Sequence, residues 1–397
     1  MNTLYMLRQQ AKWHFEKSRV VYLRPDGPVR GHVLLSYMIE PFLRSRREMR
    51  HDHTNYWECV QMAATFLGLG YAVDVINSYN KTFLPRKDYA IFVEHRTVLE
   101  RVAHSLNQDC LKIMHIDTAH ALFQNAAEAR RLLDLQRRRG ITLRPRRFMI
   151  PNLAIEYADC ATILGNEFTK STFAYANKPL YRVPISAAVL YDWPEDKDFE
   201  ACRRHFIWFN SGGLVHKGLD LVLEAFAGLP DHRLTVCGPV DREEDFAQAF
   251  RKELYETPNI RTIGWIDIAS QAFRDLTCSA VGLVSPSCSE GGGGSVVTCM
   301  HAGLVPIISY ESSVDVTADR GVVLRSCSVE EIRLAIQSIS NSSVTEIQTM
   351  ARNAWEYARA THTRKKFAEA YDAAVIAIMQ SQSGSRPDWP LPQLHPR

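Results

Sequence analysis

The sequence contains no uninterrupted apolar run of the length that spans a membrane, which is about 20 residues. Residues 1–21 also lack the apolar segment of a secretory signal, because Arg8, Lys12, Glu16 and Lys17 interrupt them. The 397 residues include nine cysteines but no Cys-x-x-Cys pair, which argues against a zinc site and against a disulfide framework. These absences predict a cytoplasmic protein whose cysteines are small buried hydrophobic residues.

The formal net charge is only +3, but it is unevenly distributed along the chain. Residues 1–185 hold 27 lysines and arginines against 17 acidic residues, whereas the remainder holds 20 against 27. Within the basic half, a predicted helix and turn over residues 125–147 carries eight arginines: Arg130, Arg131, Arg137, Arg138, Arg139, Arg144, Arg146 and Arg147. Such a run is typical of a solvated helix face. The alternative is a surface that contacts phosphates or an anionic membrane. In the membrane case the protein would lie at the inner face of that membrane. We expect no nucleic-acid partner, because no recognisable nucleic-acid-binding module accompanies these arginines.

Short apolar runs alternate with longer helical patterns, which predicts an α/β protein with parallel sheets and crossover helices. The length favours two domains, since single hydrophobic cores rarely grow beyond about 250–300 residues. We predict a first domain over residues 1–185, a linker over 186–203 and a second domain over 204–362. Residues 363–380 should form a helix that packs back on the first domain, and the Ser-, Pro- and Gln-rich residues 381–397 a loose tail.

A glycine-rich turn follows the first predicted strand of the second domain, which ends at Asn210. Its sequence, Ser-Gly-Gly-Leu-Val-His-Lys-Gly over residues 211–218, leads into a predicted helix. Gly212 and Gly213 let the backbone approach a bulky anion, and Lys217 adds a positive charge at the same place. The alternative is an ordinary turn between a strand and a helix, with Lys217 in solvent.

A second glycine-rich turn, residues 289–295, lies between a predicted strand over 280–285 and a predicted helix over 296–302. It holds four consecutive glycines: Gly291, Gly292, Gly293 and Gly294. Because such a run is costly in backbone entropy, it predicts that something approaches the chain closely here. The free N–H groups at the start of the helix, near Ser295, can bind an anion, and Glu290 can accept hydrogen bonds from sugar hydroxyls. A flexible loop is the alternative.

Both turns follow strands of one predicted parallel sheet, and the carboxyl ends of such strands are where open α/β sheets bind ligands. A lysine, two glycine-rich turns and a helix N-terminus together predict a diphosphate site. We expect no metal ion in this site, since the only Asp-x-Asp sequence, Asp196-Lys197-Asp198, falls in the predicted linker, where it fits a solvated charge cluster.

At these residues the sequence resembles the retaining glycosyltransferases of the GT-B fold, in the large family 4, or "glycosyl transferases group 1", which includes sucrose and glycogen synthases and bacterial lipid mannosyltransferases. The resemblance covers residues 206–309, in blocks over 206–226, 236–239, 263–266 and 285–303. It implies two Rossmann-like domains whose parallel sheets face each other across a cleft. It also implies transfer of a sugar from a nucleotide-diphosphate donor to an acceptor hydroxyl, with retention of configuration, without a cofactor, and with protein cations in place of a metal ion. The basic first half of the chain indicates an anionic or membrane-borne acceptor, and we expect a carbohydrate or a lipid-linked intermediate of bacterial-type polysaccharide, lipopolysaccharide or glycolipid synthesis.

The resemblance further implies roles for residues of the second domain. Glu290 and Lys217 would act in catalysis, and Pro239 would lie near the base of the donor. The implied donor-binding residues are Gly212, Gly213, Lys217, Pro239, Glu290, Gly291, Gly292, Gly293, Gly294, Ser295 and Thr298.

The first half of the chain matches the family only loosely. His53-Thr54-Asn55 resembles the start of the helix that faces the cleft, which makes His53 and Asn55 acceptor-side candidates. His115 and His120 lie just past a predicted strand, where the family often places a histidine next to the reacting sugar, and we choose His120 as the catalytic candidate. A histidine that merely makes a local hydrogen bond is the alternative.

Thr298 is a departure from the family signature, which has a second glutamate at this position, separated from the first by seven residues. In the family this glutamate commonly binds the ribose hydroxyls of the donor. A threonine can make one such hydrogen bond but is not a two-oxygen acceptor. A non-catalytic module that binds a sugar nucleotide or a partner is therefore an alternative function. A sugar-nucleotide epimerase or a phosphorylase on the same fold is another, although we recognise no lysine site for the pyridoxal cofactor of a phosphorylase.

Overall fold

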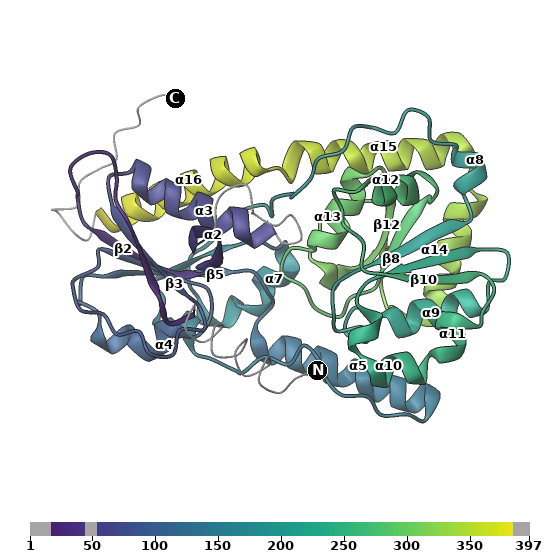
Figure 1. Cartoon of the computed structure of the whole chain (residues 1–397), viewed down its shortest axis with the longest axis horizontal. Coiled ribbons are helices and arrows are strands. Elements are labelled where there is room, and N and C mark those ends of the chain that lie inside the picture. The colour runs from purple at the N-terminus through teal and green to yellow at the C-terminus, as the bar shows by residue number, and fades with distance from the viewer. Residues whose placement is uncertain (1–16, 44–53, 384–397) are drawn as a thin grey trace.

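The computed structural model describes residues 17–43 and 54–383 and arranges them in two α/β units that lie side by side (Figure 1). The predicted acceptor-side residue His53 and most of the predicted tail lie outside the described residues. The strands of the first sheet fall in residues 20–182 and those of the second in residues 205–324. The prediction of an α/β chain with two parallel-sheet domains is confirmed, while the domain boundaries stay predictions.

The first sheet has seven strands in the order β1-β3-β2-β4-β5-β6-β7. Neighbouring strands pair in parallel, except that β1 runs antiparallel to β3 at one edge. The strands are β1 (Val20–Leu23), β2 (His32–Tyr37), β3 (Ala72–Asn77), β4 (Ile91–Glu94), β5 (Leu111–Ile116), β6 (Cys160–Ile163) and β7 (Leu180–Arg182). The inner strands read as continuous apolar runs, such as Val33-Leu34-Leu35 in β2, because both of their faces are buried.

The second sheet has six strands, all parallel, in the order β10-β9-β8-β11-β12-β13. The strands are β8 (His205–Phe209), β9 (Arg233–Cys237), β10 (Ile260–Gly264), β11 (Gly282–Ser285), β12 (Val305–Ser309) and β13 (Val322–Leu324). The two glycine-rich turns follow β8 and β11, and these two strands are direct neighbours in the sheet. Turns that lie about 75 residues apart in the sequence are thereby brought to the same place, as expected for the carboxyl edge of a parallel sheet.

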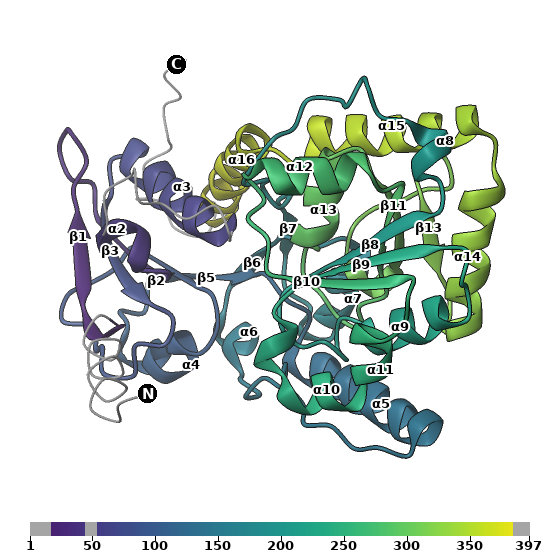
Figure 2. The same cartoon turned by 45° about the vertical axis from the view of Figure 1, so that its right-hand side comes forward.

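Helices connect the strands in both units (Figures 1 and 2). In the first half of the chain they are α2 (Glu40–Leu43), α3 (Thr54–Gly68), α4 (Val98–Val102), α5 (Ala121–Arg139), α6 (Ala154–Tyr157) and α7 (Glu167–Thr172). In the second half they are α8 (Phe199–Cys202), α9 (Leu219–Ala227), α10 (Glu244–Ala249), α11 (Arg251–Tyr255), α12 (Gln271–Cys278), α13 (Gly294–His301), α14 (Val329–Asn341), α15 (Val344–Thr361) and α16 (Arg364–Ser383). None of the helices in the described part of the chain combines the length and the hydropathy of a bilayer-spanning segment.

The last helix, α16, returns from the second unit to the first and lies along α3 (Figure 1). Tyr371 of α16 is buried, and its ring meets Phe66 of α3 edge to face. At the same contact the hydroxyl of Thr65 donates a 2.6 Å hydrogen bond to Asp372. The two units therefore share a core as well as a connecting chain.

The basic segment contains α5, which ends at Arg139 and is followed by a stretch without regular structure up to residue 153. Although it belongs to the first half of the sequence, α5 lies against α10 and α11 of the second unit in both views (Figures 1 and 2). Arg138 pairs with the fully buried Asp220 at 2.6 Å and Arg139 pairs with Glu253 at 2.7 Å. The predicted solvated face is therefore wrong for these two arginines, because they bind carboxylates of the other unit.

The predicted solvated charge cluster at residues 196–198 is also partly wrong. Asp196 and Asp198 are exposed, but Lys197 between them is buried, and its ammonium group donates 3.0 Å hydrogen bonds to the carbonyl oxygens of Thr277 and Gly303. Burial without a carboxylate partner lowers the pKa of Lys197 to about 8. Lys197 is thus a packing contact of the linker segment on the second unit.

Replacing Arg138 should destabilise the protein, because the buried Asp220 would lose its cation. We expect Arg138→Ala to lower the free energy of unfolding by about 2 kcal/mol, which corresponds to a fall of roughly 5 °C in the thermal midpoint. Arg137→Ala is the matched control, since Arg137 is 74% exposed and pairs only with Asp134 of its own helix. Equal shifts for the two variants in a thermal denaturation experiment would contradict the assignment.

Candidate functional site

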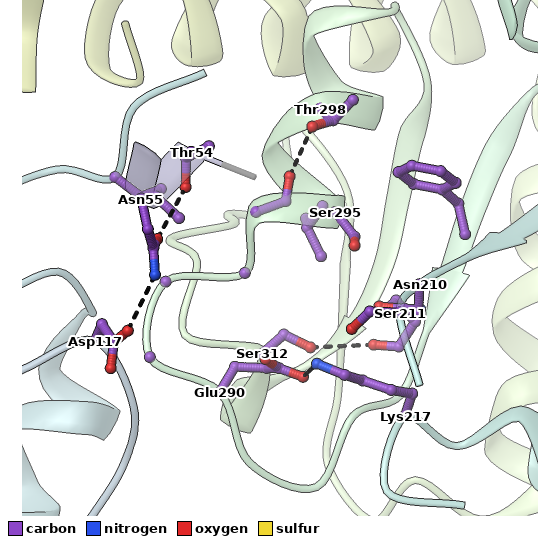
Figure 3. A pocket seen from close by; sticks show the side chains of 18 of the residues that line it. Thr54, Asn55, Asp117, Asn210, Ser211, Lys217, Glu290, Ser295, Thr298 and Ser312 are labelled. Carbon is purple, nitrogen blue, oxygen red and sulfur yellow. Dashed lines mark hydrogen bonds and ion pairs between the residues drawn. The ribbon is translucent and has the colours of Figure 1, made fainter. Parts of the chain in front are cut away.

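A cavity of about 630 Å³ lies between the two units, and both contribute to its walls (Figure 3). From the first unit come the start of α3, with Asn55, and the residue that follows β5, Asp117. From the second come Lys217 of the first glycine-rich turn and residues 290–296 of the second turn and α13. The cavity therefore opens at the carboxyl ends of both parallel sheets, where α/β folds bind ligands.

Lys217 and Glu290 form a buried ion pair in this cavity (Figure 3). The ammonium group of Lys217 binds Oε1 of Glu290, and the hydroxyl of Ser287 donates a 2.5 Å hydrogen bond to the same oxygen. Burial lowers the pKa of Lys217, and Glu290 only partly offsets that effect. Burial raises the pKa of Glu290, but Lys217, His216 and the hydrogen bonds outweigh it, so this pKa lies below its usual value. Glu290 is thus a carboxylate that accepts hydrogen bonds inside the cavity, and its predicted role toward sugar hydroxyls stays a prediction.

The second glycine-rich turn packs tightly against the first unit and against its own. A Cβ atom on Gly291 would overlap the backbone of Asp117, so only glycine lets the two units meet there. Gly293 has a positive φ of 57°, and a Cβ on it would lie 2.6 Å from the carbonyl oxygen of Ser312. The sequence predicted that something comes close to the backbone at these glycines. At Gly291 and Gly293 it is another part of the protein backbone, at Asp117 and Ser312. Gly292 and Gly294 line the cavity beside Ile185.

Helix α13 begins in the wall of the cavity. Gly293 is its N-cap residue and supplies no side-chain hydrogen bond, so no side-chain cap occupies the first N–H groups of the helix, around Ser295. Thr298 lines the cavity one turn further on, and its hydroxyl donates a 2.8 Å hydrogen bond to the carbonyl oxygen of Gly294 (Figure 3). The Thr298 oxygen therefore faces the cavity only as an acceptor.

Three predicted donor-binding residues do not line the cavity: Gly212, Gly213 and Pro239. The N–H groups of Gly213 and Leu214 donate to the carboxylate of Glu243, at 2.5 and 3.2 Å, so they are already occupied. Pro239 lines a separate, smaller cavity, and Trp265 lines both cavities. The first glycine-rich turn thus contributes Lys217 to the site, and not its backbone N–H groups at Gly213 and Leu214.

Asp117 is the main cavity-lining candidate that the sequence did not single out. The side-chain amide of Asn55 donates to its Oδ2 atom at 3.3 Å (Figure 3). His95 lies 2.6 Å from the same oxygen, and Arg96 lies 4.0 Å from Oδ1. Burial raises the pKa of Asp117, but His95 and Arg96 outweigh burial and hold it well below its usual range. The sequence held a signal for it, since Asp117 lies just past the same predicted strand as the histidine candidates, in His115-Ile116-Asp117-Thr118-Ala119-His120.

The two histidines of this segment have local partners. His115 is buried inside the first sheet, where its Nδ1 lies 2.8 Å from the hydroxyl of Thr162. His120 is the N-cap of α5, accepts a hydrogen bond from the N–H of Leu122, and lies 3.0 Å from the hydroxyl of Tyr175. The structure places His120 outside the interdomain cavity, in a small adjoining one. This geometry matches the alternative of a local hydrogen bond and does not support His120 as the catalytic residue.

The part of the chain that the structure describes contains no cluster of three or more histidine, cysteine or acidic side chains arranged to hold a metal ion. The prediction that the site uses neither a metal ion nor a cofactor is not tested by this observation and stays a prediction.

Neither protein-family models nor curated proteins match this sequence. Solved structures match its fold. Sucrose-phosphate synthase from Thermosynechococcus elongatus superposes with a TM-score of 0.61 at 14% identity, over 88% of this chain and 99% of its own. A glycosyltransferase from Rickettsia africae gives 0.58 at 10% identity, over 88% and 99%. Anabaena HepE, in complex with UDP and glucose, gives 0.55 at 12% identity, over 89% and 100%. Against TarM of S. aureus the TM-score is 0.52, and this chain spans 54% of that chain.

The two facing parallel-sheet units and these similarities define the fold class as GT-B. The predicted architecture, with two Rossmann-like domains and a cleft between them, is confirmed. At such low identities the similarity establishes the fold and leaves the activity to be argued from the site.

Replacing Gly291 should separate the walls of the cavity, because the added Cβ overlaps the backbone of Asp117. We expect Gly291→Ala to lower the free energy of unfolding by about 2 kcal/mol, the usual effect of overpacking. Gly294→Ala in the same turn is the control, since its Cβ would lie 3.5 Å from Ile185, an ordinary contact. Thermal midpoints decide the question, and an unchanged midpoint for Gly291→Ala would show that the two units do not meet as described.

Proposed function

We propose that this chain is a glycosyltransferase that moves a sugar from a nucleotide-diphosphate donor to an acceptor hydroxyl, with retention of configuration. The observation that carries the proposal is the buried pair of Lys217 and Glu290 beside the uncapped start of α13, in the interdomain cavity. A cation and free helix N–H groups suit a diphosphate, and a carboxylate suits sugar hydroxyls. Among the structures of similar fold, HepE is in complex with UDP and glucose in one case and with UDP-glucose in another.

In this reaction the bond between the anomeric carbon and the diphosphate breaks, and negative charge accumulates on the leaving diphosphate. The acceptor oxygen forms the new bond to the anomeric carbon and gives up its proton to the leaving diphosphate. Lys217 and the N–H groups at the start of α13 would stabilise that charge, since they are held in place before the reaction starts. Glu290 would orient the hydroxyls of the sugar. Trp265, which is 54% exposed at the rim, offers an aromatic face to the base of the nucleotide.

Asp117 faces this donor site from the first unit. Because its pKa is held low, Asp117 is ionised at neutral pH and can only accept hydrogen bonds. Together with Asn55 it can hold a hydroxyl of the transferred sugar or of the acceptor. The acceptor side therefore comprises Asp117 and Asn55 in place of His120.

The proposal includes a cytoplasmic enzyme of polysaccharide, lipopolysaccharide or glycolipid synthesis that acts without a metal ion on a carbohydrate or lipid-linked acceptor. The argument for an anionic membrane surface rested on the basic first half of the chain. Within that half, Arg138, Arg139 and Arg146 pair with carboxylates of the second unit, so their charges are not available to a membrane. Contact with an anionic membrane stays part of the proposal through the other basic residues of the first half.

A non-catalytic module that binds a nucleotide sugar or a partner is the second candidate. Thr298 favours it, because a single hydroxyl stands where a carboxylate would bind both ribose hydroxyls. The intact pair of Lys217 and Glu290 favours the enzyme, since both groups that would act on the sugar and on the leaving group are in place.

Replacing Lys217 tests the proposal. A thermal-shift screen against nucleotide sugars and free nucleotides first identifies the donor, because a ligand of the folded state raises the thermal midpoint. With that donor, we expect Lys217→Ala to reduce turnover by roughly 10²–10³-fold, the usual effect of removing one preorganised charge stabiliser. Lys170→Ala is the control, since Lys170 is exposed and pairs only with Glu167 of its own helix.

Because Lys217→Ala leaves Glu290 buried without its cation, the thermal midpoint of the variant is measured alongside its activity. A folded Lys217→Ala enzyme that retains turnover within a few-fold would exclude the role assigned to Lys217. Donor binding without any transfer or hydrolysis would establish the non-catalytic candidate instead.

A further inference from the structure

Arg147 lines the cavity but has no role in the donor site as described so far. It follows α5 in the first half of the sequence, yet its side chain lies across the first glycine-rich turn of the second unit. A Cβ built on Gly213 would lie 2.9 Å from Cδ of Arg147 and would overlap its Cγ. Gly213 also has a positive φ of 88°, which favours glycine. The absence of a side chain at Gly213 therefore makes room for Arg147 at the wall of the cavity.

The backbone of Arg147 is fixed by side chains of α5. Its N–H donates to both carboxylate oxygens of Glu128 at 3.0 Å, and its carbonyl oxygen accepts a 2.5 Å hydrogen bond from Gln124. Glu128 and Gln124 are both buried. The side chain thus starts from a rigid position, which lowers the entropy lost when it binds a ligand.

In the described part of the chain, the side chain of Arg147 has no carboxylate partner, whereas three nearby arginines each have one. Arg138, Arg139 and Arg146 each bind a carboxylate of the second unit. Among the described residues, no carboxylate lies within ion-pair distance of the Arg147 guanidinium, and its Nε atom is buried without a hydrogen-bond partner. A buried guanidinium N–H without an acceptor is unfavourable, and an anionic ligand oxygen would remove that cost.

Arg147 and Lys217 also lie close enough to influence each other. Burial is the main cause of the lowered pKa of Lys217, and the positive charge of Arg147 lowers it further. The cavity side of this turn therefore holds two cations, of which one, Lys217, is neutralised by Glu290. An anion placed between the two cations would relieve their repulsion.

We propose that Arg147 is a second cationic ligand of the donor's diphosphate, supplied from the first half of the chain opposite Lys217. The inference rests on the proposed function. A guanidinium group suits this task, because its fork of N–H groups can bind two phosphate oxygens at once. Arg147 would bind the diphosphate before transfer and stabilise its negative charge as it leaves. The N–H groups of Gly213 and Leu214 cannot do this, because Glu243 occupies them, and Arg147 would bind the phosphate oxygens in their place.

The test is a calorimetric titration of the full chain with UDP, ADP and GDP and with the corresponding free nucleosides. We expect Arg147→Gln to weaken binding of the preferred nucleoside diphosphate at least tenfold and to leave binding of the nucleoside within twofold. Arg147→Lys keeps the charge without the fork, and we expect an intermediate loss of roughly threefold. Arg144→Gln is the control from the same segment, since Arg144 is exposed. The affinity of this variant for the nucleoside diphosphate should equal that of the wild type.

The outcomes separate this inference from the function on which it rests. If Lys217→Ala loses diphosphate binding while Arg147→Gln and Arg147→Lys bind like the wild type, the role of Arg147 is wrong and the donor site stands. If the wild type binds none of the three diphosphates at millimolar concentration, the proposed function fails and this inference fails with it. Should Arg147→Gln not fold, the affinity of Arg147→Lys decides, and a wild-type value overturns the inference.

Discussion

The ion pairs between the α5 segment and the second unit are the interaction on which the cavity depends. Arg138 and Arg139 of this helix and Arg146 beyond it bind Asp220, Glu253 and Asp245, all of the other unit. Asp220 is fully buried, so its pair is shielded from the solvent screening that makes most surface salt bridges weak. These contacts fix the end of the segment, and with it Arg147, over the first glycine-rich turn. The opposite net charges of the two halves of the sequence have, in part, this structural cause.

The order of strands in the second sheet supplies the other half of the site. Strands β8 and β11 are neighbours, so Lys217 and Glu290 meet although 73 residues separate them in the sequence. Both are buried, and each favours the charged form of the other, since Lys217 lowers the pKa of Glu290 and Glu290 raises that of Lys217 against the effect of burial. The same sheet edge carries the start of α13, so a cation, a carboxylate and free N–H groups converge within one cavity.

The sequence predicted the features that depend on local pattern. Apolar runs and helical spacing predicted two α/β domains with parallel sheets. The glycines, the lysine and the glutamate after predicted strands predicted that Lys217, Glu290 and the turn before α13 would lie together in one site. Features that depend on contacts between distant segments were not predictable in this way. Nothing local distinguishes Arg147, which faces the cavity, from Arg138, which binds Asp220.

The same limit applies to the first glycine-rich turn and to the histidines. Gly213 fits a phosphate-binding turn by its sequence, but Glu243, 30 residues away, occupies its N–H group. His120 stands after a strand end as expected, but the chain turns there into α5 and uses the ring as a helix cap. Asp117, three residues earlier, is the side chain that reaches the cavity, because the close approach of Gly291 brings that point of the chain to the second unit.

The most direct measurement is a crystal structure of the full chain with the nucleoside diphosphate that stabilises it most. The account predicts that the diphosphate lies in the interdomain cavity, with its oxygens within hydrogen-bond distance of Lys217, Arg147 and the first N–H groups of α13. A nucleotide bound with its phosphates away from Lys217 and α13, or outside the cavity altogether, would contradict it.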